Sequence, residues 1–219
     1  PVAIQSLMEG LVKAVGTTVF ASVVAFAIGL FLGVILLIVR TNGGKPARAL
    51  VTVYVSFMRG TPLLVQLMLA FYVLPSLIDV QLSPLVAGIL ALALNTTAYI
   101  SEIFRGALTT LPRGQKQAGL ALGMRTVHIW KSILLPQVFH RSLPPLTNEF
   151  TVILKASSLL SLIAVEELST HARSATLQTD LPVEVFMITA IIYFAVLWCA
   201  SSVSRVIENR IAKLLPHVN

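Results

Sequence analysis

Five long apolar segments constrain the fold of this chain more than any other feature of its sequence. They lie at about 17–39, 54–77, 84–104, 146–165 and 183–204. Each is close to the roughly 20 residues that an α-helix needs to cross a bilayer core of about 30 Å. Charged residues make up only 11% of the chain, whereas about 25% is usual in soluble domains. The sequence therefore predicts an all-α integral membrane protein with five transmembrane helices.

No soluble domain interrupts this series of apolar segments. The sequence has no long internal repeat and no low-complexity tract, so we expect residues 1–219 to form a single transmembrane domain. The first segment is longer than a signal peptide and no small-residue cleavage pattern follows it. We therefore interpret it as a retained span.

Lysine and arginine are concentrated in alternate connections between the predicted spans. The connections after the first and third spans and the C-terminal tail carry Arg40, Lys45, Arg48, Arg105, Arg113, Lys116, Arg125, Lys131, Arg141, Arg205, Arg210 and Lys213. The other two connections, about 78–83 and 166–182, carry only Arg173 against four acidic residues. The positive-inside rule then predicts an external N-terminus and a cytoplasmic C-terminus. This bias accounts for the net charge of +7 without a nucleic-acid partner.

Residues 114–136 form a polar, basic island between apolar segments, and we call them the hook. Residues 115–122 can make a short helix, and Gly123 is the residue type that ends helices in a left-handed turn. A second short helix is predicted from Thr126 until Pro136 stops it, with Val127, Trp130 and Ile133 or Leu134 on one apolar edge. The hook is expected in the cytoplasm, where it would contact a partner.

The fourth predicted span is unusually polar. It contains Asn148, Glu149, Lys155, Ser157, Ser158 and Ser161. Glu149 and Lys155 are six residues apart, which separates them by about 120° and roughly 9 Å along a helix, so they are not an ordinary i,i+4 ion pair. Ionisable groups within a bilayer usually face a pathway or a partner.

Two adjacent stripes result from this spacing, one with Asn148, Lys155 and Ser158 and one with Glu149 and Ala156. A cavity lined by both stripes would offer an ammonium to a carboxylate and a carboxylate to an amine, the two charges that every amino acid carries. The alternative is that Glu149 and Lys155 pair with neighbouring helices and bind no solute.

Polar residues in the second and third predicted spans are open to structural interpretations. We interpret Thr61 as a helix cap and Arg59 as a charge that snorkels to the cytoplasmic face. Gln66 lies one turn deeper and could face either another helix or a solute cavity. Glu102 and Arg105 are three residues apart, so they can neutralise each other on one helix face.

Small residues recur every four positions in the first predicted span, at Ala21, Ala25, Gly29 and Gly33. Such a stripe lets helices approach closely in lipid. We favour packing within this chain over a subunit interface.

The spacing of the hook resembles the cytoplasmic coupling loop of membrane subunits in binding-protein-dependent ABC importers. That pattern is E-A-A, three residues, G, nine residues, I-x-L-P. Its matches here are Gln117, Ala118, Gly119, Gly123, Ile133, Leu135 and Pro136. Gln117 replaces the usual Glu, which removes a charge, and Gly119 replaces the usual Ala.

Two further blocks are similar to the polar amino acid branch of the same family. One is the run Arg59-Gly60-Thr61-Pro62-Leu63-Leu64-Val65-Gln66, and the other is Asn148-Glu149-Phe150 followed by Lys155-Ala156-Ser157-Ser158-Leu159. With the apolar segments, the resemblance covers nearly the whole chain. Ala156 stands where many relatives have an acid, which disfavours a substrate with a cationic side chain.

The resemblance implies the permease subunit of a type I ABC importer, with a coupling helix in a cytoplasmic loop at about 106–140. The ATPase-coupling residues would be Gln117, Ala118, Gly119, Leu122, Gly123, Met124 and Arg125. The substrate-binding residues would be Glu149, Lys155, Ala156, Ser157, Ser158 and Gln66. The substrate would be a polar amino acid or a close analogue, moved by alternating access.

The same resemblance implies the partners and the location. A second permease chain, identical or different, would complete the pathway in the bacterial inner membrane, in contact with membrane lipid. Two cytoplasmic ATP-binding-cassette subunits would bind ATP and Mg²⁺, and an extracytoplasmic solute-binding protein would deliver the substrate.

Other functional classes find little support in the sequence. There is no G-x-x-x-x-G-K-[ST] run, so ATP would be bound by another chain. The single Cys199 cannot form an internal disulfide, the four histidines show no metal-ligand spacing, and we find no catalytic cluster. The remaining alternative is an autonomous ion-coupled transporter or channel with Glu149 and Lys155 as a charge relay. The small number of spans, the lack of an inverted repeat and the hook argue against it.

Overall fold

The computed structural model describes residues 2–214, and every regular element within them is helical. The α-helices are α1 (Val2–Asn42), α2 (Lys45–Gly60), α3 (Leu63–Met68), α4 (Leu74–Ile78), α5 (Pro84–Thr109), α6 (Gly114–Ala121), α7 (Thr126–Ile129), α8 (Leu135–Ala156), α9 (Leu168–Thr179) and α10 (Pro182–Leu214). Two π-helical turns, η1 (Leu69–Val73) and η2 (Trp130–Leu134), and one 3-10 helix, η3 (Ser157–Ile163), complete them.

Four helical stretches within the described residues are long and apolar enough to cross a membrane. A fifth is obtained if the bent pair at residues 45–60 and 63–78 counts as one span. The expectation of an all-α membrane protein is therefore confirmed.

The central contact of the fold is between α1 and α5, which pack along much of their length. Ala21 and Ala25 of α1 are fully buried. A Cβ atom on Gly29 would lie 2.6 Å from Cγ2 of Thr96, and one on Gly33 would lie 2.8 Å from Cγ2 of Ile100. The small-residue stripe thus serves packing within this chain.

The second apolar segment, expected as a span at about 54–77, is not one continuous helix. The chain bends by 108° between α2 and the helix that follows it. Pro62 has no N–H and its ring disfavours helical geometry in the preceding residue, and Thr61 accordingly is extended, with φ −115° and ψ 147°. Thr61 ends α2 instead of capping the next helix, and its hydroxyl donates to the Phe57 carbonyl.

A helix occupies most of the segment at 166–182, which we had expected to be a plain connection. This helix, α9, begins with Glu167 as its N-cap, and the carboxylate accepts the Thr170 N–H at 3.0 Å. Glu167 is fully buried, and it also accepts a hydrogen bond of 2.8 Å from the Tyr193 hydroxyl on α10. Its neighbour Leu168 donates its N–H to Thr18 on α1. The Thr18 hydroxyl also donates to the Glu167 carboxylate at 3.5 Å, so one buried carboxylate links α1, α9 and α10.

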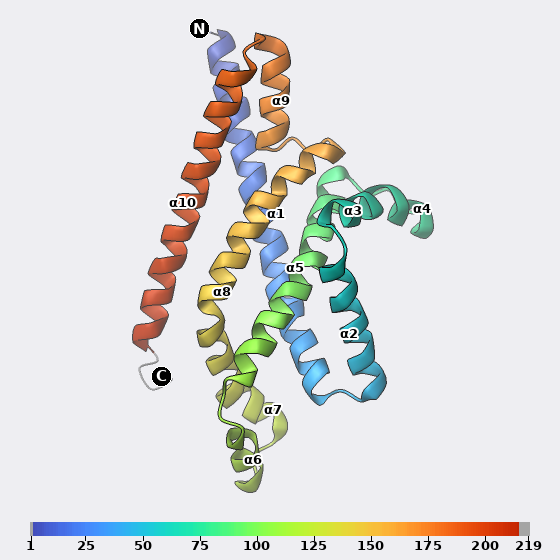
Figure 1. The fold of residues 1–219 in the computed structure, drawn as a ribbon, viewed down its shortest axis with the longest axis vertical. Coiled ribbons are helices and arrows are strands. Elements are labelled where there is room, and N and C mark those ends of the chain that lie inside the picture. Colours follow the sequence, from blue (N-terminus) through green and yellow to red (C-terminus); the bar gives the residue numbers. More distant parts are fainter. Residues whose placement is uncertain (1, 215–219) are drawn as a thin grey trace.

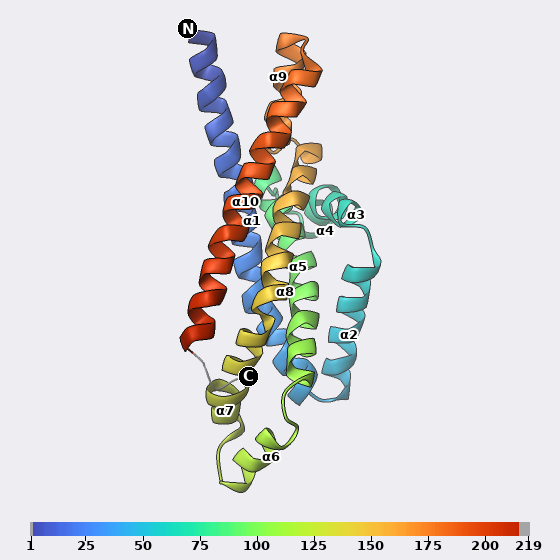
Figure 2. The same ribbon diagram turned by 60° about the vertical axis from the view of Figure 1, so that its left-hand side comes forward.

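The long helices order the connections into two groups at opposite ends of the molecule. Figures 1 and 2 show the start of α1 together with α9 at one end. The link between α1 and α2, the hook and the end of α10 lie at the other end. The connections rich in Lys and Arg therefore share one side of the molecule.

Candidate functional site

The hook is an ordered turn between two helices. Helix α6 ends at Ala121, and Gly123 adopts φ +75°, the left-handed region that glycine tolerates. The Met124 N–H donates to the Gly119 carbonyl and the Gly123 N–H donates to the Leu120 carbonyl, both at 3.0 Å. This pair of bonds is the Schellman motif that closes helix C-termini.

The second arm of the hook differs from its prediction, because Pro136 does not stop it. Helix α7 continues through the π-helical turn η2 into α8, so the arm is the start of a helical stretch at residues 126–163. Pro136 lies in the first turn of α8, and the wider π turn just before it relieves the clash that a proline ring makes with the preceding turn. The expected loop at 106–140 is accordingly shorter, because α5 extends to Thr109 and α8 begins at Leu135.

Several contacts hold the hook against the long helices. Gln115 and Gln137 exchange amide hydrogen bonds of 3.1 and 2.8 Å, which tie α6 to the base of α8. The Lys116 ammonium donates to Asn42 Oδ1 at the end of α1, at 3.0 Å. Gly119 lies against the fully buried Ile129, where an added Cβ would approach within 2.9 Å. These hydrogen bonds tie the hook to α1 and α8, and the Gly119–Ile129 contact packs its two arms together.

The coupling residues expected from the sequence divide into two groups by exposure. Gln117, Ala118, Leu122, Gly123 and Arg125 are exposed, whereas Gly119 is buried and Met124 is partly buried. The side chain of Leu122 is 81% exposed, which is extreme for an apolar group. The apolar edge predicted for the second arm is divided in the same way: Trp130 and Leu134 are buried, but Val127 is 77% exposed.

Glu149 and Lys155 point to different sides of α8. Glu149 is 7% exposed, whereas Lys155 lies on the exposed face of the helix. Among the described residues, neither side chain makes an ion pair or a hydrogen bond with another residue. The described structure therefore does not bring these two charged groups together.

The exposed face of α8 has a regular composition. Arg141, Pro145, Asn148, Val152 and Lys155 are all exposed, at spacings of four, three, four and three residues. Such spacing places them on one side of a helix. Asn148 and Lys155 would be costly in contact with hydrocarbon, so this face requires water or another protein against it.

The remaining predicted substrate residues lie at the end of this helix. Ser157 is fully buried and its hydroxyl donates to the Leu154 carbonyl at 2.7 Å. Ser158 and Ala156 are partly exposed, and the Ser158 hydroxyl donates to the Lys155 carbonyl at 2.8 Å. The switch from α-helix to the 3-10 helix η3 occurs at Ser157.

Gln66 stabilises the bend between α2 and α3. Its side-chain amide donates to the carbonyls of Met58 and Thr61 at 2.8 and 3.1 Å and to the Thr61 hydroxyl. Its side-chain oxygen accepts from Asn95 on α5 at 3.0 Å. Because both ends of the amide are engaged, the geometry favours the helix-partner role of Gln66 over direct solute binding.

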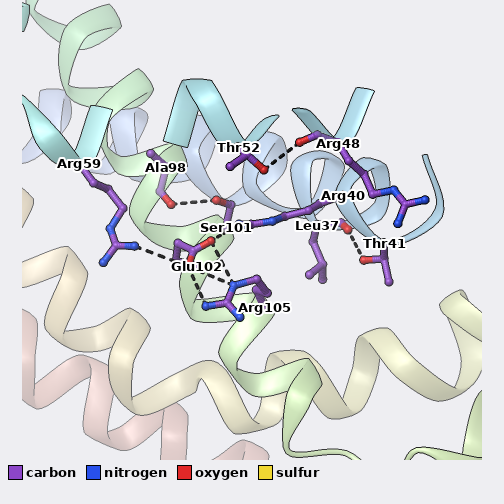
Figure 3. A network of polar contacts seen from close by, with 10 residues as sticks. All are labelled: Leu37, Arg40, Thr41, Arg48, Thr52, Arg59, Ala98, Ser101, Glu102 and Arg105. Carbon is purple, nitrogen blue, oxygen red and sulfur yellow. Dashed lines mark hydrogen bonds and ion pairs between the residues drawn. The ribbon is translucent and has the colours of Figure 1, made fainter. Parts of the chain in front are cut away.

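Three arginines converge on the single carboxylate of Glu102 (Figure 3). Arg105 donates to it from the next turn of α5, at 2.9 to 3.2 Å, as the sequence predicts. Arg40 of α1 also donates to Glu102, and Arg59 of α2 lies 3.5 Å from it. Arg59 also stacks over the Tyr99 ring, 5.5 Å from its centre.

Besides the snorkelling expected from the sequence, Arg59 has an ionic partner in Glu102, and its side chain remains 46% exposed. Arg59 lies at the end of α2 that is farther from the hook (Figure 1), and Glu102 supplies the charge that it would otherwise seek in water. The sequence signal was an arginine in the last turn of an apolar helix with no acid nearby in the sequence. An arginine in such a position indicates an acidic partner on another helix.

Comparison with known proteins gives a consistent picture. Residues 25–213 match the family model described as "Binding-protein-dependent transport system inner membrane component". The L-cystine transport system permease protein TcyB of Bacillus subtilis is 37% identical over 195 residues, 89% of this chain and 83% of that protein. The glutamine transport system permease protein GlnP of Escherichia coli is 32% identical over 209 residues, 95% of this chain and 94% of that protein.

Solved structures show the same fold. A chain from the crystal structure of an amino acid ABC transporter with histidines superposes with a TM-score of 0.84 at 30% identity, covering 95% of this chain and 97% of that one. A chain of the MetNI methionine ABC transporter in an inward-facing conformation superposes with a TM-score of 0.77 at 18% identity, covering 94% and 98% of the two chains. At that lower identity the likeness concerns the fold alone.

Proposed function

The chain belongs to the family of binding-protein-dependent transport system inner membrane components, and from this premise we propose that it is the permease subunit of an ABC importer for a polar amino acid or a close analogue. The relatives named for L-cystine and glutamine transport support an amino acid substrate. The alternative of an autonomous ion-coupled transporter is disfavoured by family membership. The chain is a transport subunit, and ATP hydrolysis belongs to a separate subunit.

Among the residues of this chain, those of the hook give this proposal its main support. The hook is anchored to α1 and α8, its helix α6 lies beyond the ends of the long helices (Figure 1), and Leu122 at the end of α6 is 81% exposed. Residues Gln117 to Arg125 would dock on a cytoplasmic ATP-binding-cassette subunit, which binds ATP and Mg²⁺. Two such subunits would serve the two permease chains of one importer.

The exposed face of α8 would line the substrate pathway with a second permease chain. Lys155 supplies an ammonium for the substrate carboxylate, and Asn148 supplies an amide on the same face. Glu149 would take the amine after a change of conformation, because it is buried in the present one. Ala156, Ser157 and Ser158 would complete the site, with Ser157 holding the end of the helix.

The orientation follows from charge and from the two groups of connections. We place the hook and the end of α10 in the cytoplasm, because the basic connections share that end of the molecule. The N-terminus and α9 would then face outwards, where a solute-binding protein delivers the substrate. The chain would act as one membrane domain.

Reconstitution of the complete importer tests the proposed function. The permease, its partner ATPase and the solute-binding protein are combined in lipid nanodiscs, and ATP hydrolysis is measured with and without amino acid on the binding protein. We expect a stoichiometric ATPase on the permease and hydrolysis that rises with the loaded binding protein. A permease that purifies and transports an amino acid without any ATPase would refute the importer assignment.

A further inference from the structure

The hook carries positive charge that nothing in its own segment neutralises. Residues 103–148 contain no Asp or Glu. Arg113, immediately before the hook, and Arg125 and Lys131 within it are exposed, and none of the three forms an ion pair with any residue in the described part of the chain. Gln117 is also exposed and carries no charge. The lysine, arginine, aspartate and glutamate side chains in this segment are therefore all cationic.

The hook also exposes apolar side chains. Leu120, Leu122 and Val127 are 48%, 81% and 77% exposed. Protein–protein interfaces typically combine an apolar centre with a polar rim and are enriched in arginine. The exposed residues of the hook combine apolar and cationic side chains in the same way.

The position of the hook favours a protein partner over a lipid surface. Figures 1 and 2 show α6 as the part of the molecule farthest from the middle of the long helices. It lies beyond the ends of α1 and α5, outside the part of the molecule that the long helices span. A protein in the aqueous phase fits this placement better than a lipid surface does.

We propose that the hook is recognised by an acidic groove of the ATPase subunit, in which Leu122 fills an apolar depression and Arg113, Arg125 and Lys131 pair with carboxylates at the rim. This inference rests on the proposed function, because it describes the partner of the same hook. The charge on the groove, not its shape alone, would then distinguish the cognate ATPase from other ATPases.

Adding a negative charge to the hook tests whether the groove of the ATPase is acidic. The variant Gln117→Glu changes side-chain size and helix preference little but introduces a negative charge among the cations. With an acidic groove we expect it to weaken ATPase binding by about two- to fivefold, the range of exposed ion pairs. Arg125→Gln should weaken binding by a similar factor, and Arg48→Gln, an exposed arginine on α2 outside the hook, should leave it unchanged.

Affinity is measured between the permease in nanodiscs and its fluorescently labelled ATPase, at several salt concentrations. We expect wild-type affinity to fall as salt rises, because the Debye length shortens from about 10 Å at 0.1 M. The affinity of the Arg125→Gln variant for the ATPase should fall less steeply with salt. Tighter binding by Gln117→Glu, or affinity independent of salt, overturns the acidic groove while leaving the importer assignment intact.

Varying the lipid composition of the nanodisc distinguishes an ATPase partner from an anionic membrane surface. One outcome is that Arg125→Gln binds the ATPase normally but retains less anionic phosphatidylglycerol, relative to phosphatidylcholine, than the wild type does. The cations then bind the membrane surface, and the inference is wrong. If wild-type permease binds no ATPase in any salt, the proposed function itself fails. Loss of ATPase binding with unchanged lipid retention supports the acidic groove.

Discussion

Gly123 offers the sharpest test of the hook, because its surroundings separate backbone strain from steric contact. It has φ +75°, and a Cβ atom built on it meets nothing within 4 Å. Any cost of a substitution must therefore come from the left-handed backbone conformation alone. Non-glycine residues pay about 1–2 kcal/mol there, whereas asparagine tolerates it better.

Three variants form a graded series at this position. Gly123→Asn should be mild, Gly123→Ala should cost about 1–2 kcal/mol, and Gly123→Val should cost more because β-branching restricts it further. A loss of 1–2 kcal/mol shifts the equilibrium away from the closed hook by roughly 5- to 30-fold. The misplaced segment would carry Leu122 and Arg125 out of the docking position.

Two measurements follow the series. Hydrogen exchange of the Met124 amide, which donates to the Gly119 carbonyl, reports the closed turn directly. ATP hydrolysis stimulated by loaded solute-binding protein, in nanodiscs, reports coupling. We expect protection and coupling to fall together in the order Gly, Asn, Ala, Val, with normal membrane insertion throughout. Wild-type coupling in Gly123→Val would show that the turn does not transmit the ATPase motion, and equal effects of Asn and Ala would contradict the backbone argument.

Three further predictions concern the membrane-spanning helices. Lys155→Met should lower substrate affinity roughly ten- to a hundredfold, the worth of a charge-assisted hydrogen bond, with ATPase assembly intact; a direct binding assay that finds unchanged affinity would return Lys155 to a structural role. Gly29→Ala should destabilise the α1–α5 contact by about 1–3 kcal/mol through overpacking, whereas Gly16→Ala, with nothing within 4 Å of its added Cβ, should be neutral or stabilising in thermal unfolding. In a Cys199→Ser background, Leu177→Cys on α9 should react with an impermeant thiol reagent from outside intact cells and Arg113→Cys should not, and the opposite pattern would invert the proposed topology.

Much of this protein is determined by local sequence. The apolar segments and the scarcity of charge require helices in a membrane, because each backbone polar group must then be satisfied within its own segment. The left-handed turn at Gly123 follows equally locally, since glycine is the residue type that tolerates this conformation. The pair formed by Glu102 and Arg105 needs only one helix face.

Tertiary structure decided the partners of groups that are distant in the sequence. Whether Arg59 snorkels or pairs depended on where α5 places Glu102, and no spacing within α2 contains that information. Gln66 likewise found its partners in Thr61, Met58 and Asn95 only because the chain bends at Pro62. Glu149 and Lys155 were separated by the way α8 packs, which buries one face and exposes the other. Periodicity shows which residues share a face of a helix, but only the packing of several helices determines which faces are buried.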